Sequence, residues 1–230
     1  MRWFKFSSQT HLIQELSGKI TSLLDISIRE KGRASLVVSG GSTPVPLFEE
    51  LARQEIDWSR VYITLADERW VPPSHNDSNE GLVRRHLLKE RAQKAIFVGL
   101  YTGAKDAKQG EKECEERVRT IGPPFDLLIL GMGSDGHTAS LFPGADNLAS
   151  AVNLESDRVC MAISPADAPH ERMTLTLQAL LKSRNIFLHI TGEEKIQVLQ
   201  KALSQGPVEQ MPIRFVLSCA KGPVNIYWAP

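Results

Sequence analysis

The sequence predicts an α/β fold in which helices cover both faces of a mainly parallel sheet. Short apolar runs alternate with stretches of helical periodicity along nearly the whole chain. The runs are continuously apolar, which is typical of strands buried on both faces. Regular alternation of strand and helix favours parallel pairing through helical crossovers.

The first predicted unit is a strand at residues 3–6 followed by a helix at residues 9–31, where apolar residues recur at helical spacing. Continuous apolar runs predict the later strands, at residues 36–38, 61–65, 126–130, 159–163, 186–190, 214–217 and 224–228. Helical periodicity predicts the other helices, at residues 45–53, 79–88, 106–120, 173–182 and 193–204.

The composition favours one domain over residues 1–230, because 42% hydrophobic content in 230 residues suits a single α/β core and no linker interrupts the pattern. Lys+Arg and Asp+Glu both total 27, so no net field favours nucleic acid or an anionic membrane. The three cysteines favour a reducing compartment, and we expect a cytoplasmic location. No signal-peptide core and no run of about 18 apolar residues occurs, so no membrane partner is expected.

A glycine-rich loop follows the predicted strand 36–38. Ligands bind beyond the carboxyl ends of parallel strands, so this loop is a candidate binding segment. Gly40 and Gly41 allow close backbone approach, and Ser42 and Thr43 supply hydroxyl groups before a predicted helix. Such a helix N-terminus suits a phosphate, although an ordinary tight turn has the same residues.

Asp67, Glu68 and Arg69 follow the strand predicted at 61–65 and place two carboxylates and a guanidinium at the same edge. Arg69 has the forked geometry that binds phosphate oxygens. A surface cluster of ion pairs is the alternative reading. Further on, Ser78 or Asn79 is placed to cap the next helix.

The segment after the strand predicted at 126–130 resembles a dinucleotide fingerprint, because Gly131, Gly133 and Gly136 match its spacing. That fold requires a long helix to open at the third glycine. Pro143 and Gly144 interrupt the segment after roughly two helical turns. We therefore predict a loop rather than a dinucleotide site.

His137 lies within this loop, beside Asp135. Imidazole titrates near neutrality, so a neutral His137 is suited to take a proton from water and return it to a leaving oxygen. Most single histidines are structural, but a histidine in a glycine-rich loop at a strand end has little core around it. His137 is therefore the candidate general base.

Arg172 and Lys195 follow two later predicted strands and are candidates for binding phosphate, although each alone reads equally as a solvated helix charge. No His-x-x-x-His, no paired cysteines and no acidic ligand pattern occurs, so we expect neither a metal nor a cofactor. We also expect no obligatory protein partner.

Taken in order, these segments resemble the 6-phosphogluconolactonases, within the group that includes the amino-sugar-phosphate isomerases. The similar segments cover residues 39–44, 67–72, 75–79, 131–143, 172–176, and Gly192 with Lys195. The resemblance implies a three-layer, Rossmann-like α/β fold that hydrolyses 6-phospho-D-glucono-1,5-lactone in the oxidative pentose phosphate pathway. It implies a phosphate site of the Gly-Gly-Ser-Thr loop with Arg69, Arg172 and Lys195, and it implies His137 as base and no cofactor. It also implies that Asp67 orients a substrate hydroxyl or His137 itself, and the division of roles between Asp67 and Asp135 stays open.

Two other functions are weighed against lactone hydrolysis. The related isomerases and deaminases carry a proton-shuttling Glu shortly after the histidine, and Phe142 stands where that Glu would fall. An apolar ring cannot carry protons, so this replacement favours the lactonase. A silent sugar-phosphate sensor is disfavoured by His137 and by the lack of any recognisable effector segment.

Overall fold

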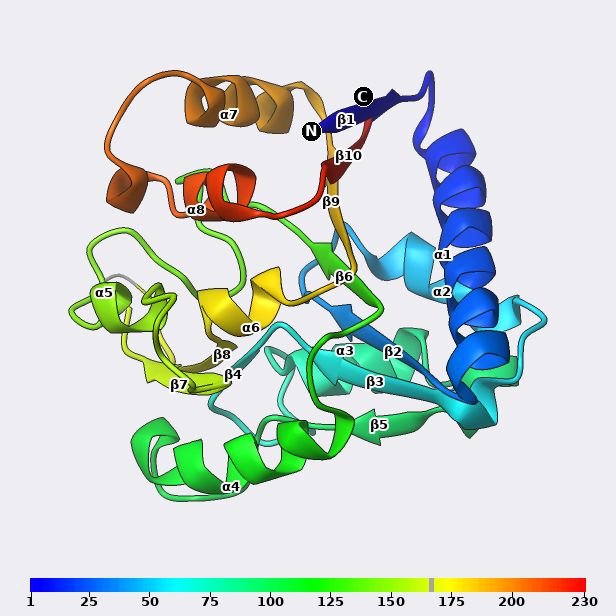
Figure 1. The fold of residues 1–230 in the computed structure, drawn as a ribbon, viewed down its shortest axis with the longest axis horizontal. Coiled ribbons are helices and arrows are strands. Elements are labelled where there is room, and N and C mark those ends of the chain that lie inside the picture. Colours follow the sequence, from blue (N-terminus) through cyan, green and yellow to red (C-terminus); the bar gives the residue numbers. More distant parts are fainter. Residues whose placement is uncertain (166–167) are drawn as a thin grey trace.

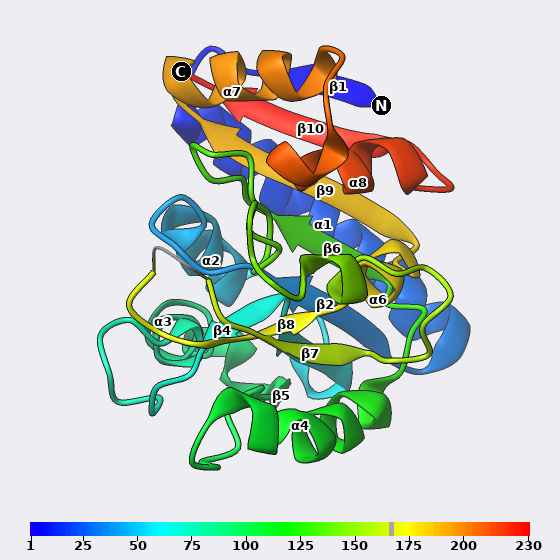
Figure 2. The same ribbon diagram turned by 90° about the vertical axis from the view of Figure 1, so that its left-hand side faces the viewer.

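The computed structural model describes residues 1–165 and 168–230. Its larger sheet comprises β1 (Arg2–Lys5), β2 (Ala34–Val38), β3 (Val61–Leu65), β5 (Ile96–Val98), β6 (Leu127–Leu130), β9 (Asn185–Thr191) and β10 (Val224–Ala229). These strands lie in the order β1-β10-β9-β6-β2-β3-β5, and every neighbouring pair is parallel (Figures 1 and 2). The predicted parallel sheet is confirmed.

A smaller antiparallel sheet lies beside the larger one. It comprises β4 (Asp67–Arg69), β7 (Cys160–Ile163) and β8 (Arg172–Leu175), in the order β4-β8-β7. The predicted strand at 159–163 belongs here and not to the parallel sheet. The sequence did not predict β4, β5 or β8, which are only three or four residues long.

The helices are α1 (Gln9–Lys31), α2 (Val45–Arg53), α3 (Asn79–His86), α4 (Ala107–Ile121), α5 (Leu148–Ala151), α6 (Leu177–Leu181), α7 (Glu193–Leu203) and α8 (Ile213–Cys219). Helices α1 and α2 cover one face of the parallel sheet, and α6, α7 and α8 cover the other (Figures 1 and 2). This three-layer arrangement confirms the predicted fold class. None of the helices in residues 1–165 and 168–230 is long and apolar enough to cross a membrane.

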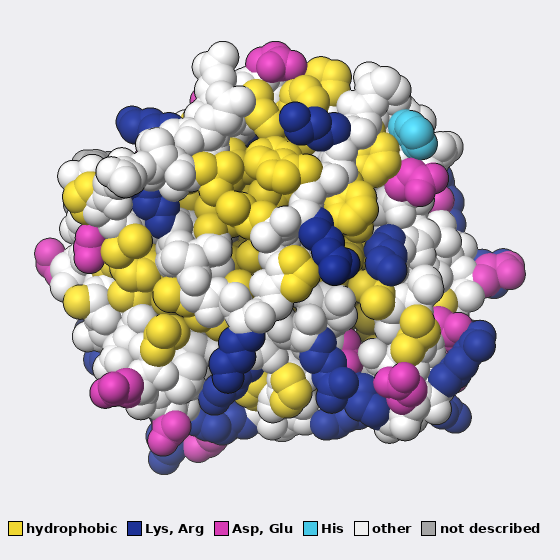
Figure 3. All heavy atoms as spheres, turned by 45° about the horizontal axis from the view of Figure 1, so that its top comes forward, with side chains coloured by type: hydrophobic (Ala, Val, Ile, Leu, Met, Phe, Trp, Pro, Cys, Tyr) yellow, Lys and Arg dark blue, Asp and Glu magenta, His cyan; other side chains and the backbone are white. Residues whose placement is uncertain are grey.

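Helix α1 shows how the sequence pattern becomes structure. Leu12, Leu16 and Ile20 recur at four-residue spacing and are fully buried, each contributing about 1.5–3 kcal/mol of hydrophobic stabilisation. The helix begins where the Ser8 hydroxyl accepts from a first-turn N–H, and it ends at Gly32, whose φ of +78° suits glycine. On the outer surface, basic and acidic side chains are both present on the face in Figure 3.

The predicted strand at 214–217 is wrong, because these residues belong to α8. Ile213 and Val216 are buried three residues apart, which is helical spacing. The Arg214 guanidinium donates to the carbonyl oxygens of Lys201, Ala202 and Pro207, at or just after the end of α7. A four-residue apolar run fits either structure, and this long-range contact favours the helix.

The predicted helix at 173–182 is wrong in its first half. Residues 172–175 form β8, which is buried between β4 and β7, and only Leu177–Leu181 forms a helix. The Thr176 hydroxyl accepts from the Ala179 N–H and caps α6, so the helix begins after the strand.

Candidate functional site

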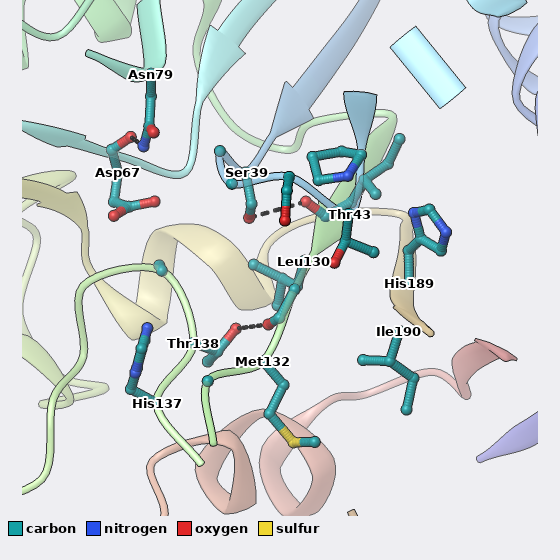
Figure 4. A pocket seen from close by; sticks show the side chains of 18 of the residues that line it. Ser39, Thr43, Asp67, Asn79, Leu130, Met132, His137, Thr138, His189 and Ile190 are labelled. Carbon is teal, nitrogen blue, oxygen red and sulfur yellow. Dashed lines mark hydrogen bonds between the residues drawn. The ribbon is translucent and has the colours of Figure 1, made fainter. Parts of the chain in front are cut away.

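A pocket of about 280 Å³ opens where β2, β6 and β9 end. Of the residues predicted for the site, loop residues 40–43, Asp67, Arg69, His137 and Lys195 all line this pocket. Figure 4 shows His137 and Asp67 on one side of it, and Thr43 and His189 on the other. Segments that are far apart in the sequence therefore meet at one edge of the sheet.

The loop between β2 and α2 forms one wall of the pocket. Ser39 anchors its start, since both its N–H and its hydroxyl donate to the carbonyl oxygen of Ile129 on β6, at 3.1 Å each. Gly41 has a φ of +97°, a conformation that glycine adopts without strain. Within the described part of the chain, no protein acceptor takes the N–H groups of residues 40–43. These amides precede α2, so they can bind an anion.

His137 is held on its Nδ1 side. This nitrogen lies 2.6 Å from Asp135 Oδ1, and the His137 backbone N–H donates to the same oxygen at 3.0 Å. Burial opposes ionisation of Asp135, but these two hydrogen bonds keep its pKa below the ordinary value. An ionised carboxylate only accepts, so Nδ1 carries the proton and Nε2 keeps the lone pair.

The glycines of this loop make room for that contact. A side chain at Gly133 would overlap the His137 ring and the Asp135 carboxylate, and Gly136 has a φ of +80°. Residues 131–144 contain turns and one isolated bridge, Thr138 to Leu141, and no helix opens at Gly136. The loop prediction is confirmed, and the dinucleotide reading has no helix to support it.

The three side chains of strand β4 point alternately to opposite faces of the strand. Asp67 and Arg69 line the pocket, whereas Glu68 points the opposite way and is fully buried, so only one of the two carboxylates expected at this edge faces the pocket. Asp67 Oδ2 accepts from the Ser140 hydroxyl at 2.6 Å. The structure thus places Asp135, and not Asp67, against His137.

Glu68 joins β4 to the start of α3. Its carboxylate accepts from the backbone N–H groups of Arg69, Asn79 and Glu80, at 2.7 Å each, and from the Ser78 hydroxyl at 3.1 Å. Burial raises the pKa of Glu68 to about 7, against the lowering effect of the backbone donors. Of the two predicted cap candidates, Ser78 is the helix cap, because its hydroxyl accepts from the Gly81 N–H.

The predicted cations occupy different positions. Lys195 lines the pocket, and no described residue forms an ion pair with it. Arg172 is buried and is not part of the lining: it lies opposite Arg69 across β4 and β8, with its guanidinium 5.8 Å from the centre of the Phe142 ring. Burial, followed by the charge of Arg69, lowers the pKa of Arg172.

Phe142 also lies against the candidate base, with its ring centre 4.4 Å from that of His137. Phe142, which stands where the resemblance leads us to expect a Glu in the isomerases, is therefore packed on the imidazole. An aromatic ring there offers no group for proton transfer.

His189 and Asn79 line the pocket with polar side chains and were not among the predicted site residues. His189 is 2% exposed, neither of its ring nitrogens has a partner among the described residues, and burial lowers its pKa to about 4. Asn79 is also buried: its side-chain amide donates to the Asp67 carbonyl oxygen at 2.8 Å, and its Oδ1 accepts from no described residue. A histidine inside an otherwise apolar strand was the available signal for His189.

The family model described as glucosamine-6-phosphate isomerases/6-phosphogluconolactonase matches residues 7–228. A curated 6-phosphogluconolactonase from Pseudomonas putida is 42% identical over 219 residues, which cover 95% of this chain and 89% of the relative. A crystal structure of a 6-phosphogluconolactonase from Shewanella baltica is 46% identical, with a TM-score of 0.97, and the match covers 100% of this chain and 98% of that one.

A monomeric glucosamine-6-phosphate deaminase also has this fold, with a TM-score of 0.80 at 19% identity over 100% of this chain and 97% of the other. That likeness concerns the fold alone, so the fold does not separate the activities within the group. The family match spans nearly the whole chain, and the chain belongs to the glucosamine-6-phosphate isomerase/6-phosphogluconolactonase family.

Proposed function

We propose that this chain hydrolyses 6-phospho-D-glucono-1,5-lactone to 6-phospho-D-gluconate, the second step of the oxidative pentose phosphate pathway, with His137 as general base. One observation carries the proposal: His137 lines the pocket with its Nδ1 held by Asp135, which leaves Nε2 to act on a water. The names of the relatives support the same activity.

In the proposed reaction, Nε2 of His137 takes a proton from water while the water oxygen bonds to the lactone carbonyl carbon. The tetrahedral intermediate then breaks its bond to the ring oxygen, which takes the proton back from His137. The ionised Asp135 stabilises the imidazolium between these steps, because its Oδ1 accepts the Nδ1 proton across an N···O distance of 2.6 Å. Asp67, fixed by Ser140, is proposed to orient a substrate hydroxyl.

The substrate's phosphate is proposed to bind the amides and hydroxyls of Gly40, Gly41, Ser42 and Thr43, with Lys195 and Arg69 supplying charge. Arg172 is proposed to add positive charge to the phosphate site without lining the pocket, since it pairs with Arg69 across β4 and β8. The proposed chemistry uses no cofactor. We also propose a cytoplasmic location, consistent with free thiols at all three cysteines.

The test is a lactone-hydrolysis assay on the purified chain, with and without chelator, measured against the spontaneous rate. We expect hydrolysis well above that background and, at saturating substrate, unaffected by chelator. Loss of activity with chelator and its rescue by a divalent ion would reject the mechanism. Ammonia release from glucosamine 6-phosphate would instead identify a deaminase, and product binding without turnover would identify a sensor.

A further inference from the structure

A cluster of two imidazoles and one carboxylate lies beside the pocket and takes no part in the proposed reaction. His75 and Asp77 belong to the connection between β4 and α3, and His170 precedes β8, 93 positions beyond Asp77. His170 Nε2 lies 2.9 Å from Asp77 Oδ2, and His75 Nδ1 lies 3.8 Å from the same oxygen. One ligand atom from each residue lies within 4.8 Å of the other two.

We propose that His75, Asp77 and His170 bind a divalent cation of the zinc class, such as Zn²⁺, Co²⁺ or Ni²⁺. Two imidazole nitrogens with one carboxylate oxygen suit these ions, whereas Ca²⁺ and Mg²⁺ prefer shells built of oxygen. The Asp77 N–H donates to His75 Nδ1 at 3.1 Å, so this nitrogen is unprotonated and has the lone pair that a metal ligand needs, and an ion bound there replaces this hydrogen bond.

The three side chains are free to close around an ion. Their exposed fractions are 46% for His75, 54% for Asp77 and 25% for His170. Bonds of about 2.0–2.1 Å in a tetrahedron require ligand atoms about 3.3 Å apart. The distances from Asp77 Oδ2 already lie on either side of that value, so modest side-chain rotations are enough.

The cluster is joined to the two arginines beside the pocket. Arg69 Nη1 donates to the backbone carbonyl oxygen of Asp77 at 2.6 Å, and Arg172 Nη1 donates to that of His170 at 2.7 Å. Two of the three ligand residues therefore hold the two guanidinium groups. An ion bound by the cluster fixes both carbonyl groups in place, and with them both arginines.

This connection sets the sign of the coupling between a cation in the cluster and an anion in the pocket. The divalent cation adds positive charge beside Arg69 and Arg172, and an anion in the pocket relieves the repulsion. Each should therefore raise the affinity of the other. The choice of 6-phosphogluconate as anion rests on the proposed function, but the metal site does not.

The first experiment titrates Zn²⁺ into the full chain by calorimetry and repeats the titration with Co²⁺ by visible absorption. We expect one ion per chain, with His75→Ala and His170→Ala each weakening binding more than about tenfold, or 1.4 kcal/mol. His11→Ala is the matched control, because this exposed histidine lies on α1, outside the cluster. No binding, or equal affinity in cluster and control variants, overturns the proposal.

The second experiment repeats the zinc titration in saturating 6-phosphogluconate. In the unchanged chain we expect the anion to raise zinc affinity at least about fivefold. In His170→Ala, whose zinc affinity is already weakened, the anion should not change the affinity that remains. Equal zinc affinity with and without the anion overturns the coupling. Failure of the lactone assay leaves the titration without anion unaltered, so the two proposals fail separately.

Discussion

Replacing His137 should affect turnover and leave ligand binding largely unchanged. His137→Ala should lower kcat by roughly 10²- to 10⁴-fold, because it removes a group that acts mainly in the transition state. Binding of 6-phosphogluconate, measured by calorimetry, should remain nearly intact. Near-normal turnover in this variant would remove His137 from the base role and make Asp67 the next candidate.

Lys195 and Arg172 should differ in effect because only Lys195 lines the pocket. Lys195→Ala should weaken 6-phosphogluconate binding by about tenfold or more, as expected for a lost charged contact, and Arg172→Ala should weaken it less. Lys201→Ala, which changes an exposed lysine on the same helix, is the control.

The unchanged chain should prefer phosphorylated lactone over plain gluconolactone by more than about tenfold, and a smaller preference would argue against this phosphate site.

His189 should make stability depend on pH. Its folded pKa of about 4 lies below the ordinary 6.5, so its contribution to stability is present above pH 6.5 and is lost as the pH falls through 4. Between pH 7 and about pH 4.5 this loss amounts to roughly 2–3 kcal/mol. Urea unfolding should show a shallower acid loss in His189→Leu than in the unchanged chain or in His11→Leu. Parallel curves for all three would contradict this account.

At this scale, the sequence predicted residues that directly follow a strand, because their position in the chain indicates their place at the sheet edge. Gly40, Thr43, Asp67 and Lys195 were found on this basis. The His75–Asp77–His170 cluster was not predicted, since its members come from two loops joined only by the fold. The partner of His137 was left open between Asp67 and Asp135, and hydrogen-bond geometry selects Asp135.

At the scale of elements, Glu68 should anchor β4 to α3. Glu68→Ala removes the acceptor for three backbone N–H groups and a hydroxyl, so unfolding free energy should fall by about 3 kcal/mol. Glu68→Gln keeps one acceptor oxygen and should cost less. Glu113→Ala, on an exposed part of α4, is the control in chemical denaturation. If Glu68→Ala and Glu113→Ala proved equally stable, the anchoring role would be refuted.

Long periodic segments could be predicted from sequence, whereas short elements could not. Helices α1 and α2 begin and end where predicted, because many spaced apolar residues define each one. Strands β4 and β8 contain three and four residues, too few to show a period, and their pairing joins segments about a hundred positions apart. The run at 214–217 was misassigned for the same reason: its helix depends on contacts of Arg214 with the end of α7.

At the scale of the whole molecule, we propose that residues 1–230 form one domain, since the buried apolar side chains of both sheets belong to one cluster. Thermal unfolding should then give one transition, with calorimetric and van't Hoff enthalpies equal. Saturation with 6-phosphogluconate should move that whole transition upward. Two separable transitions, only one of which responds to the ligand, would indicate two domains.

The position of β10 has a consequence for synthesis on the ribosome. This strand, residues 224–229, follows the other strands of the parallel sheet in the chain and lies between β1 and β9, so the strand of this sheet that is made last fills an interior place. Until it emerges, β1 has no neighbour within the sheet and β9 keeps an open edge. The sheet therefore cannot be completed before residues 224–229 have left the ribosome, and a chain truncated before Val224 has two unpaired strand edges exposed to aggregation.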